Sequence, residues 1–345
     1  MQHPGQLFIV LAELNAGRLK KENIQYDRVD KLEFCELFDE LEYMLEIYMI
    51  KFLVFSDLHY DDVEDGDKRI DNILANARSR QLDFIVSLGD LCKPVAANCK
   101  VLERFASLGV PFYPVIGNHE TDESDLRAII DFYSLNAPYY SVLHSNYKLI
   151  FMNTCYLTEN GTEKAYYKRN FKHSSSVYPI VPMDEIRWLQ DELNSGMKCI
   201  IFSHHSFVNE FMKRGVSNKS IIQKLFHENA VLLCLNGHDH GDSFACIDGI
   251  CYMTVNSANY AWLGTQIASS KTLMEKYSYL QGMLQYAQAM SAYIEIDDHE
   301  IRIFGEEGSY LSVTPDDIEL HDYMWNGVSI KPQISSYRIC LKAVE

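Results

Sequence analysis

Five short apolar segments of the chain each end in side chains that commonly bind metal ions. Ligand sites in α/β sheets lie beyond the carboxyl ends of the strands, so five such endings are expected to meet at one place. Each ending alone is a weak signal, because Gly-Asp and His-x-His arise by chance, but six of the twelve histidines lie in this series. The alternative is a set of unrelated polar loop ends. The five endings are Ser56-Asp57-Leu58-His59, Leu88-Gly89-Asp90, Gly117-Asn118-His119-Glu120, Ser203-His204-His205 and Gly237-His238-Asp239-His240.

The residue types in these endings favour hard to borderline divalent metals. Carboxylates, imidazoles and an amide carbonyl suit Mn, Fe or Zn, and the lack of cysteine disfavours a structural zinc site. Alternate residues of an extended chain point the same way, so Asp57 and His59 are expected to reach one metal together. By the same rule Asp239 is expected to point away from His238 and His240. The glycine before the ligand-type residue in three endings is expected to let the backbone turn tightly.

Composition narrows the class of protein. The 345 residues are 47% hydrophobic and 23% charged, which is ordinary for a globular chain with a large core. The net charge of −17 argues against a nucleic-acid duplex or an anionic membrane as a partner. The nine cysteines form no C-x-x-C pair and are interpreted as reduced, which favours a cytoplasmic location. Neither a secretory signal nor an apolar run of about 20 residues is predicted.

From residue 50 onward, apolar and amphipathic segments alternate, which is typical of β-α-β units. Strands are expected at 51–56, 84–88, 112–116, 198–203 and 231–236, and helices at 67–81, 95–108, 126–133, 182–193 and between the last two strands. Hairpins are expected at 139–154, 244–255 and 292–304. Residues 156–181 are expected to form a long loop, of the kind that often serves as a functional lid. Residues 306–345 show no clear pattern.

The first 48 residues differ from the rest. Apolar residues recur at helical spacing among acidic ones over residues 30–48, which predicts an acidic amphipathic helix. This helix could dock on its own chain, form a homodimer or be dispensable. The predicted organisation is a helical extension at 1–48, a catalytic domain at 49–305, and a C-terminal extension at 306–345 that packs on the domain or is partly irregular.

The series of endings resembles the calcineurin-like metallophosphoesterase family over residues 50–260. The resemblance implies an α/β fold in which a two-sheet β-sandwich is flanked by helices, giving four layers. It also implies two divalent or trivalent metal ions, Mn, Fe or Zn. In the implied arrangement Asp57, His59 and His240 hold one metal, Asn118, His204 and His238 hold the other, Asp90 bridges both, and His119 is the catalytic histidine near the leaving group.

The predicted function is hydrolysis of a small phosphorylated substrate by attack of a metal-bound hydroxide, with His119 protonating the leaving alkoxide. A phosphodiester is favoured, because Tyr139–Ser141 resembles a hairpin of bacterial members of the family. The alternatives are a phosphomonoesterase, including a phosphoprotein phosphatase, and a non-catalytic metal-binding interaction protein. The last is disfavoured because none of the expected ligands is missing.

Three positions depart from the family pattern. Lys93 stands where protein phosphatases carry an Asp that orients the catalytic histidine, so the partner of His119 is left open. Glu120 stands where the family often has Asp, and Phe207 where many relatives have Pro.

Further residues are candidates for contact with the substrate. His205 is expected to point away from His204 and to line the pocket wall. Arg214 is the preferred phosphate-binding cation, whereas Lys168, Arg169, Lys172 and Lys213 are interpreted as solvated charge. Tyr166, Tyr167, Tyr260 and Trp262 are candidates for stacking on a ring, and residues 256–263 are expected to border the pocket.

Overall fold

The computed structural model describes residues 49–172, 176–211, 213–264, 275 and 282–341. The chain divides into two units, residues 1–48 and 49–345. The predicted acidic helix at 30–48, and the homodimer that it could form, therefore lie outside the described residues.

Two six-stranded sheets form the centre of the second unit. The β1 sheet has the order β19-β16-β15-β1-β2-β3, and its β1, β2 and β3 run parallel. Its strands are β1 (Ile50–Phe55), β2 (Phe84–Ser87), β3 (Phe112–Pro114), β15 (Ala292–Ile296), β16 (Glu300–Phe304) and β19 (Tyr337–Cys340). The β10 sheet has the order β11-β12-β10-β9-β5-β4, with a parallel centre of β12, β10, β9 and β5. Its strands are β4 (Tyr140–His144), β5 (Tyr147–Phe151), β9 (Lys198–Ser203), β10 (Val231–Asn236), β11 (Ser243–Ile247) and β12 (Ile250–Thr254).

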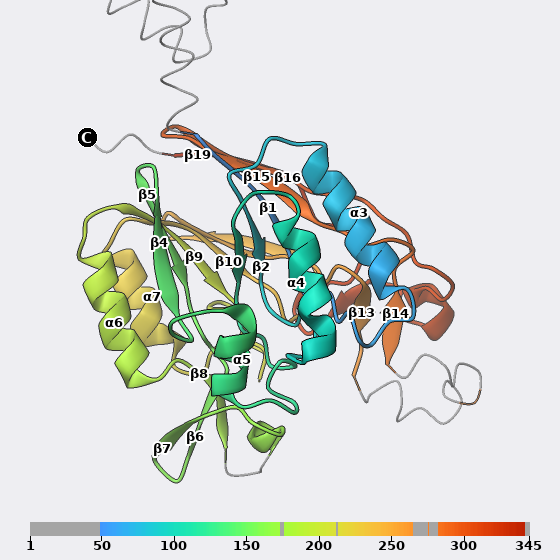
Figure 1. Ribbon diagram of the computed structural model, residues 1–345, viewed down its shortest axis with the longest axis horizontal. Coiled ribbons are helices and arrows are strands. Elements are labelled where there is room, and N and C mark those ends of the chain that lie inside the picture. Colours follow the sequence, from blue (N-terminus) through green and yellow to red (C-terminus); the bar gives the residue numbers. More distant parts are fainter. Residues whose placement is uncertain (1–48, 173–175, 212, 265–274, 276–281, 342–345) are drawn as a thin grey trace, which may run out of the picture. The chain divides into compact units, whose positions relative to one another are not determined.

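The two sheets pack face to face, and helices cover their outer faces (Figure 1). Phe52 on β1 contacts Phe202 on β9 with ring centroids 5.9 Å apart, which places both in the core between the sheets. Leu53 and Phe55 point to the other side of β1 and pack against α3 (Gly66–Arg78), α4 (Cys99–Ala106) and α5 (Leu126–Tyr133). The outer face of the β10 sheet packs against α6 (Met183–Leu193) and α7 (Lys219–His227).

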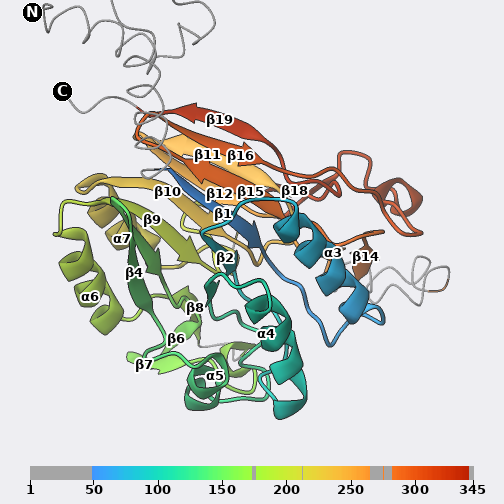
Figure 2. The same ribbon diagram turned by 45° about the horizontal axis from the view of Figure 1, so that its top comes forward.

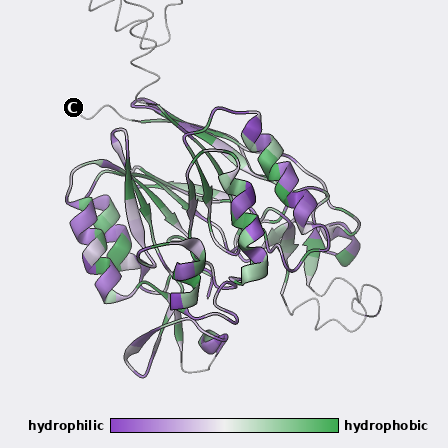
Figure 3. Cartoon of the chain, in the orientation of Figure 1, coloured by the Kyte–Doolittle hydropathy of each residue, from purple (hydrophilic) through white to green (hydrophobic). Residues whose placement is uncertain are grey.

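This arrangement follows from the hydropathy of the segments. The central strands are apolar on both faces, as parallel strands covered by helices must be, and the helices carry one apolar stripe each (Figure 3). Burial of these stripes produces four layers and confirms the predicted α/β sandwich. The predicted strands and helices between residues 50 and 155, and between 182 and 304, are confirmed to within a few residues.

Residues 156–181 do not form the predicted irregular loop. They contain a three-stranded sheet of order β7-β6-β8, from β6 (Tyr156–Glu159), β7 (Thr162–Ala165) and β8 (Val177–Ile180), with a 3-10 turn at Asn170–Lys172. This inserted sheet projects at the lower end of Figure 1. Its own small core contains Leu157 and Tyr166. The strands have four residues each, too few for alternation to stand out in the sequence.

The C-terminal residues 306–341 pack within the second unit. The strand β19 adds an edge to the β1 sheet next to β16 (Figure 2). The segment also contains a 3-10 turn at Pro315–Ile318 and a hairpin of β17 (Met324–Trp325) and β18 (Val328–Ser329). Ser329 pairs with Asp242, two residues beyond His240, so this hairpin borders the fifth predicted motif.

The cysteines differ from the prediction at one place. Cys246 on β11 and Cys251 on β12 are direct cross-strand neighbours and form a disulfide. The interpretation of all nine cysteines as reduced is therefore wrong, and the cytoplasmic location loses that support. Within the described residues, no helix has the length and apolar character needed to span a membrane.

Candidate metal centre

The ligand-type side chains converge beyond the carboxyl ends of β1, β2, β9 and β10. Asp57, His59 and His240 form one group whose donor atoms lie within 4.8 Å of one another. The Oδ1 atom of Asp57 lies 3.3 Å from Nε2 of His240 and 3.8 Å from Nε2 of His59. The two Nε2 atoms lie 3.3 Å apart. Three donors therefore surround one point, as the sequence predicted for the first metal.

Asp90 lies at the centre of the cluster. Its Oδ2 atom is 3.6 Å from Nε2 of His59 and 3.3 Å from Nε2 of His204. The latter nitrogen is also 3.1 Å from Oδ1 of Asn118. Asp90 thus faces ligands from both predicted metal sites, which is the position that a bridging carboxylate requires.

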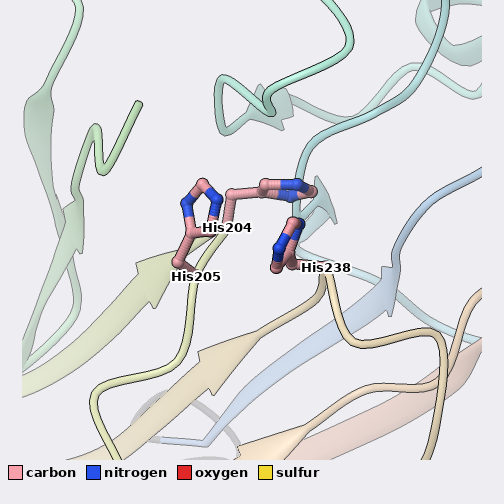
Figure 4. A group of neighbouring side chains, drawn as sticks. All are labelled: His204, His205 and His238. Atoms are coloured by element: carbon pink, nitrogen blue, oxygen red, sulfur yellow. The ribbon is translucent and has the colours of Figure 1, made fainter. Parts of the chain in front are cut away.

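His204, His205 and His238 form a further group with donor atoms within 4.8 Å of one another (Figure 4). His205 does not point away from this group as predicted. A hydrogen bond of 2.7 Å between its Nδ1 and Oγ1 of Thr154 holds its ring beside His238, with ring centroids 4.1 Å apart. Burial lowers the pKa of both His205 and His238 well below the usual value, with the neighbouring His204 as the next cause for His205 and the neighbouring His205 as the next cause for His238, and this keeps both rings neutral.

The backbone at the cluster is not extended, which corrects the reasoning applied to D-x-H and H-x-H. Five of the predicted ligands are non-glycine residues in the left-handed region: Asp57, His59, Asp90, His238 and His240, with φ between 46° and 67°. Such residues persist only where their surroundings hold them in place, and they concentrate at functional sites. Asp57 and His59 do share one group, but they reach it through a tight turn after β1 and not through alternation, and His238 and His240 lie in different groups.

The glycines of the motifs serve close approach as much as turning. Gly89 has a φ of 100°, as the turn prediction requires. Gly117 and Gly237 do not have positive φ. A Cβ at Gly117 would lie 2.2 Å from Oδ1 of Asp90, and a Cβ at Gly237 would lie 1.7 Å from Oγ of Ser56. Both positions therefore exclude any larger residue because the cluster packs directly against the backbone.

The side chains fit a cationic occupant. Nδ1 of His204 bonds the carbonyl of Leu88 at 2.8 Å, and Nδ1 of His240 bonds that of Tyr260 at 2.9 Å. Because those Nδ1 atoms must donate, each Nε2 directs a lone pair into the cluster when its ring is neutral. Oδ1 of Asp57 is buried there and has no hydrogen-bond partner among the described residues. A buried carboxylate oxygen facing imidazole lone pairs is the donor set of a transition-metal site.

The charged side chains of the cluster shift one another's pKa values. Burial opposes ionisation of Asp90 and of His204. Their mutual attraction outweighs burial, lowers the pKa of Asp90 well below its usual range and raises the pKa of His204 to about 10. Metal binding requires neutral His204, so uptake of a cation there releases a proton.

Glu120, a departure from the family pattern, links two of the motifs. Its Oε2 accepts hydrogen bonds from the backbone N–H groups of Asp90 and Gly117, both at 3.0 Å. Its Oε1 accepts from the N–H of Leu91 at 2.8 Å and from the hydroxyl of Tyr133 at 2.9 Å. The residue therefore joins the turn after β2 to the turn after β3.

His119 lies beside the cluster but is more exposed, with 44% of its side chain accessible. Its backbone N–H donates to Oδ1 of Asp90 at 2.8 Å, and its ring meets that of His59 edge-on, with centroids 4.9 Å apart. Burial lowers the pKa of His119, but the carboxylates of Asp90 and Asp122 outweigh it and raise that pKa to about 9. Its ring is thus protonated at neutral pH.

The partner of His119 that the sequence left open is Asp122. Nδ1 of His119 lies 2.9 Å from Oδ2 of Asp122, and the same oxygen accepts a hydrogen bond of 2.5 Å from Nη2 of Arg169, in the turn that follows β7 of the inserted sheet. Lys93, at the position of the protein-phosphatase Asp, instead pairs with Glu123 at 3.7 Å. The interpretation of Arg169 as solvated charge is wrong. A signal for Asp122 did exist, because it lies three residues after His119 in one turn.

Three other candidates for contact with the substrate, Arg214, Tyr260 and Tyr166, are in contact with groups of the protein itself. Arg214 donates to the backbone carbonyl of His238 at 3.2 Å, which places it behind that ring. Tyr260 is buried and packs on His240 with centroids 4.7 Å apart. Tyr166 is buried in the core of the inserted sheet, and Phe207 packs on Phe226 of α7.

Sequence comparison identifies the family of the chain. A model of the family described as calcineurin-like phosphoesterase matches residues 50–242, more than half of the chain. The chain belongs to this family. It is therefore a metal-dependent phosphoric ester hydrolase by membership, and the named resemblance is confirmed. Among proteins of curated function, none matches the chain.

Solved structures share the fold of this phosphoesterase at low sequence identity. A dimetal phosphatase from Danio rerio aligns with a TM-score of 0.56 and 13% identity, over 85% of this chain and 99% of the other. GAP50, described as the anchor in the inner membrane complex of Plasmodium, aligns with a TM-score of 0.53 and 13% identity, over 86% of this chain and 90% of the other. At such identities these matches establish the fold alone.

Proposed function

We propose that this phosphoesterase hydrolyses a small phosphodiester and that His119 protonates the leaving alcohol. The observation that carries the proposal is the position of His119: an accessible, protonated imidazole beside a buried cluster suited to two cations. A general acid must reach the solvent-facing side of the phosphoryl group, where the leaving oxygen departs.

The proposed ligand assignment is the one that the family resemblance implies, and the proximity of the side chains supports it. Asp57, His59 and His240 hold one cation, Asn118, His204 and His238 hold the other, and Asp90 lies between them. Two bound cations would supply an activated water and neutralise charge on the phosphoryl oxygens. The chain itself fixes the donor directions through the carbonyls that bond Nδ1 of His204 and His240.

The cavity next to His119 supports a diester over a monoester. It has a volume of about 110 Å³, which suits a small alcohol group. Apart from the proposed metal ligands His59 and Asp90, its lining carries more carboxylates than cations, with Asp61, Asp62, Glu120, Asp122 and Glu123 against Lys93, His119 and Arg169. A phosphomonoester carries nearly two negative charges at neutral pH, whereas a diester carries one. Acidic walls therefore penalise the monoester more.

A paired assay tests this proposal. The protein is loaded with manganese, zinc or iron and given bis-(p-nitrophenyl) phosphate and p-nitrophenyl phosphate at equal concentration. We expect a higher kcat/KM for the diester, by about tenfold or more, because each unit of repulsive charge near the site costs on the order of 1 kcal/mol.

Two results would overturn it. A faster reaction with the monoester would assign the protein as a phosphomonoesterase. Absence of turnover with every metal and both esters, together with absence of metal after gentle purification, would favour an interaction protein that keeps the fold.

A further inference from the structure

The contact between His119 and Asp122 is directional. Nδ1 of His119 lies 2.9 Å from Oδ2 of Asp122, whose side chain is only 11% exposed. Nε2 of His119 has no hydrogen-bond partner among the described residues, so the nitrogen opposite Asp122 is the one available to a substrate. An anionic acceptor at Nδ1 fixes both the ring orientation and the position of the protons.

Arg169 connects this pair to the inserted sheet at two points. Nη2 of Arg169 donates to the same Oδ2 of Asp122 at 2.5 Å. One residue earlier, the backbone N–H of Lys168 donates to the carbonyl of Thr121 at 3.0 Å. Lys168 and Arg169 both adopt left-handed backbone conformations, with φ of 48° and 57°. The turn is therefore held in a rarely populated shape that presents the guanidinium to Asp122.

The carboxylate of Asp122 depends on these two partners. Its Oδ1 atom is buried and has no partner among the described residues, so both contacts use the single oxygen Oδ2. Without Arg169, rotation of the carboxylate would bring either oxygen toward water and would release Nδ1 of His119. Lys93 offers no substitute, because its ammonium group pairs with Glu123.

We propose that Asp122 and Arg169 are positioning residues for His119, and that through them the inserted sheet controls protonation of the leaving group. This inference rests on the proposed function. When the bond between phosphorus and the leaving oxygen breaks, the proton on Nε2 of His119 moves to that oxygen. The imidazole becomes neutral and keeps its proton on Nδ1, bonded to Asp122. Asp122 takes no proton, and Arg169 holds its charge and direction.

The first test compares leaving groups in the Asp122→Asn variant. Phenyl and p-nitrophenyl esters of one alkyl phosphate differ in how much the leaving oxygen needs a proton. We expect kcat for the phenyl ester to fall by about 10²-fold, within the usual contribution of a general acid. For the p-nitrophenyl ester we expect a fall of less than about threefold, since its leaving group needs little protonation. KM and the metal content per chain are expected to stay at wild-type values.

The second test isolates the inserted sheet. Arg169→Ala is expected to lower kcat for the phenyl ester by about tenfold. Arg169→Lys is expected to restore part of that rate, because lysine supplies a positive charge near Asp122 but lacks the planar guanidinium group. Lys164→Ala is the matched control. Lys164 lies on β7 of the same sheet and its ammonium pairs with Glu159 at 2.9 Å, so this variant is expected to match wild type for both esters.

The outcomes separate this inference from the proposed function. Equal losses for both esters in Asp122→Asn, or a loss in Lys164→Ala equal to that in Arg169→Ala, would overturn the positioning role. Absence of turnover in the wild-type protein would instead overturn the proposed function. In that case NMR still decides: a slowly exchanging Nδ1 proton of His119 is expected in wild type and lost in Asp122→Asn and Arg169→Ala. Its persistence in both variants would overturn the inference.

Discussion

Two adjacent groups of side chains in this phosphoesterase are built in opposite ways. The ligand cluster, which comprises Asp57, His59, Asp90, Asn118, His204, His238 and His240, is largely buried and follows the ends of central strands. The rim group, which comprises His119, Asp122 and Arg169, belongs to turns and to the inserted sheet. Side-chain exposure reaches 44% at His119 and 52% at Arg169.

The difference separates what each group controls. The ligand cluster is fixed by backbone that the sandwich holds rigid, and its buried charges need one another or bound cations. The rim group is fixed by two side-chain hydrogen bonds, one between residues three apart in a turn and one between residues 47 apart in the sequence. Substitutions in the cluster should therefore change both metal content and rate, whereas those in the rim should change rate alone.

The largest effect is expected for Asp90→Asn. Asp90 faces ligands of both proposed metal sites, at 3.6 Å from His59 and 3.3 Å from His204. Loss of its charge leaves neither cation fully neutralised, so we expect kcat to fall by more than about 10³-fold. Metal content measured by elemental analysis should fall from about two ions per chain to one or none.

The matched control is Asp239→Asn. Asp239 is also a buried carboxylate in a motif, but it accepts a hydrogen bond from Asn209 at 3.0 Å and points away from the cluster, as predicted. It should keep both metals. An equal loss of metal in Asp239→Asn and Asp90→Asn would show that Asp90 does not act as a central carboxylate of the cluster.

The second effect belongs to the rim. His119→Ala should reduce kcat on a diester with a poor leaving group by about 10²–10⁴-fold, because a general acid is removed. Metal content should remain at the wild-type value, which separates this variant from Asp90→Asn. Full phosphodiesterase activity in His119→Ala would show that another group protonates the leaving alcohol.

The ligand cluster was predictable from sequence because each ligand lies in a short motif next to the strand that positions it. Each ligand follows an apolar strand, and parallel strands of one sheet share their carboxyl edge, so order along the chain translates into proximity. The detailed geometry was not predictable. The left-handed backbone of Asp57 and His59, and the ring of His205 turned toward His238 by Thr154, depend on tertiary contacts.

The rim group could be predicted only in part. His119 lies in a recognisable motif. An acidic chain offers many other carboxylates as its partner, so the sequence did not single out Asp122. The partner Arg169 is 47 residues away from Asp122, in a segment whose short strands gave no periodic signal. Pairings of this kind depend on the three-dimensional path of the insertion and not on any local pattern.

A smaller effect is expected at the boundary between the two groups. Oδ2 of Asp62 lies 3.3 Å from Nδ1 of His59, and its side chain is 46% exposed. Asp62→Asn should weaken metal binding at the first site by about tenfold, the low end for a residue that orients a metal-binding histidine, because solvent screens the charge. Manganese titration by calorimetry measures this. Glu64→Gln removes the same charge from an exposed neighbour and should leave the affinity unchanged.

The smallest effect concerns a buried carboxylate outside both groups. Glu185 on α6 is fully buried, and its Oε1 accepts a hydrogen bond from the N–H of Asn153 at 2.8 Å. Its Oε2 has no partner among the described residues. Burial raises the pKa of Glu185 well above the usual 4.5, and the single backbone hydrogen bond does not offset it. Unlike Asp57 and Asp90, this carboxyl group has no imidazole near it, within the part of the chain that the structure describes, to favour its ionised form.

The sign of the pH dependence follows from that shift. Above pH 4.5 the unfolded chain releases the proton of Glu185 while the folded chain keeps it, so rising pH lowers the free energy of unfolding until the raised pKa is passed. Glu185→Gln keeps the acceptor for Asn153 and removes this loss. The Tm of the variant should therefore exceed that of wild type by a few degrees at pH 7, and the difference should shrink toward pH 4.5. Asp191→Asn, exposed on the same helix, should show no such trend. A Tm difference that stayed constant across this range would mean that Glu185 is already ionised when folded, and that burial of a carboxylate here needs no counter-charge.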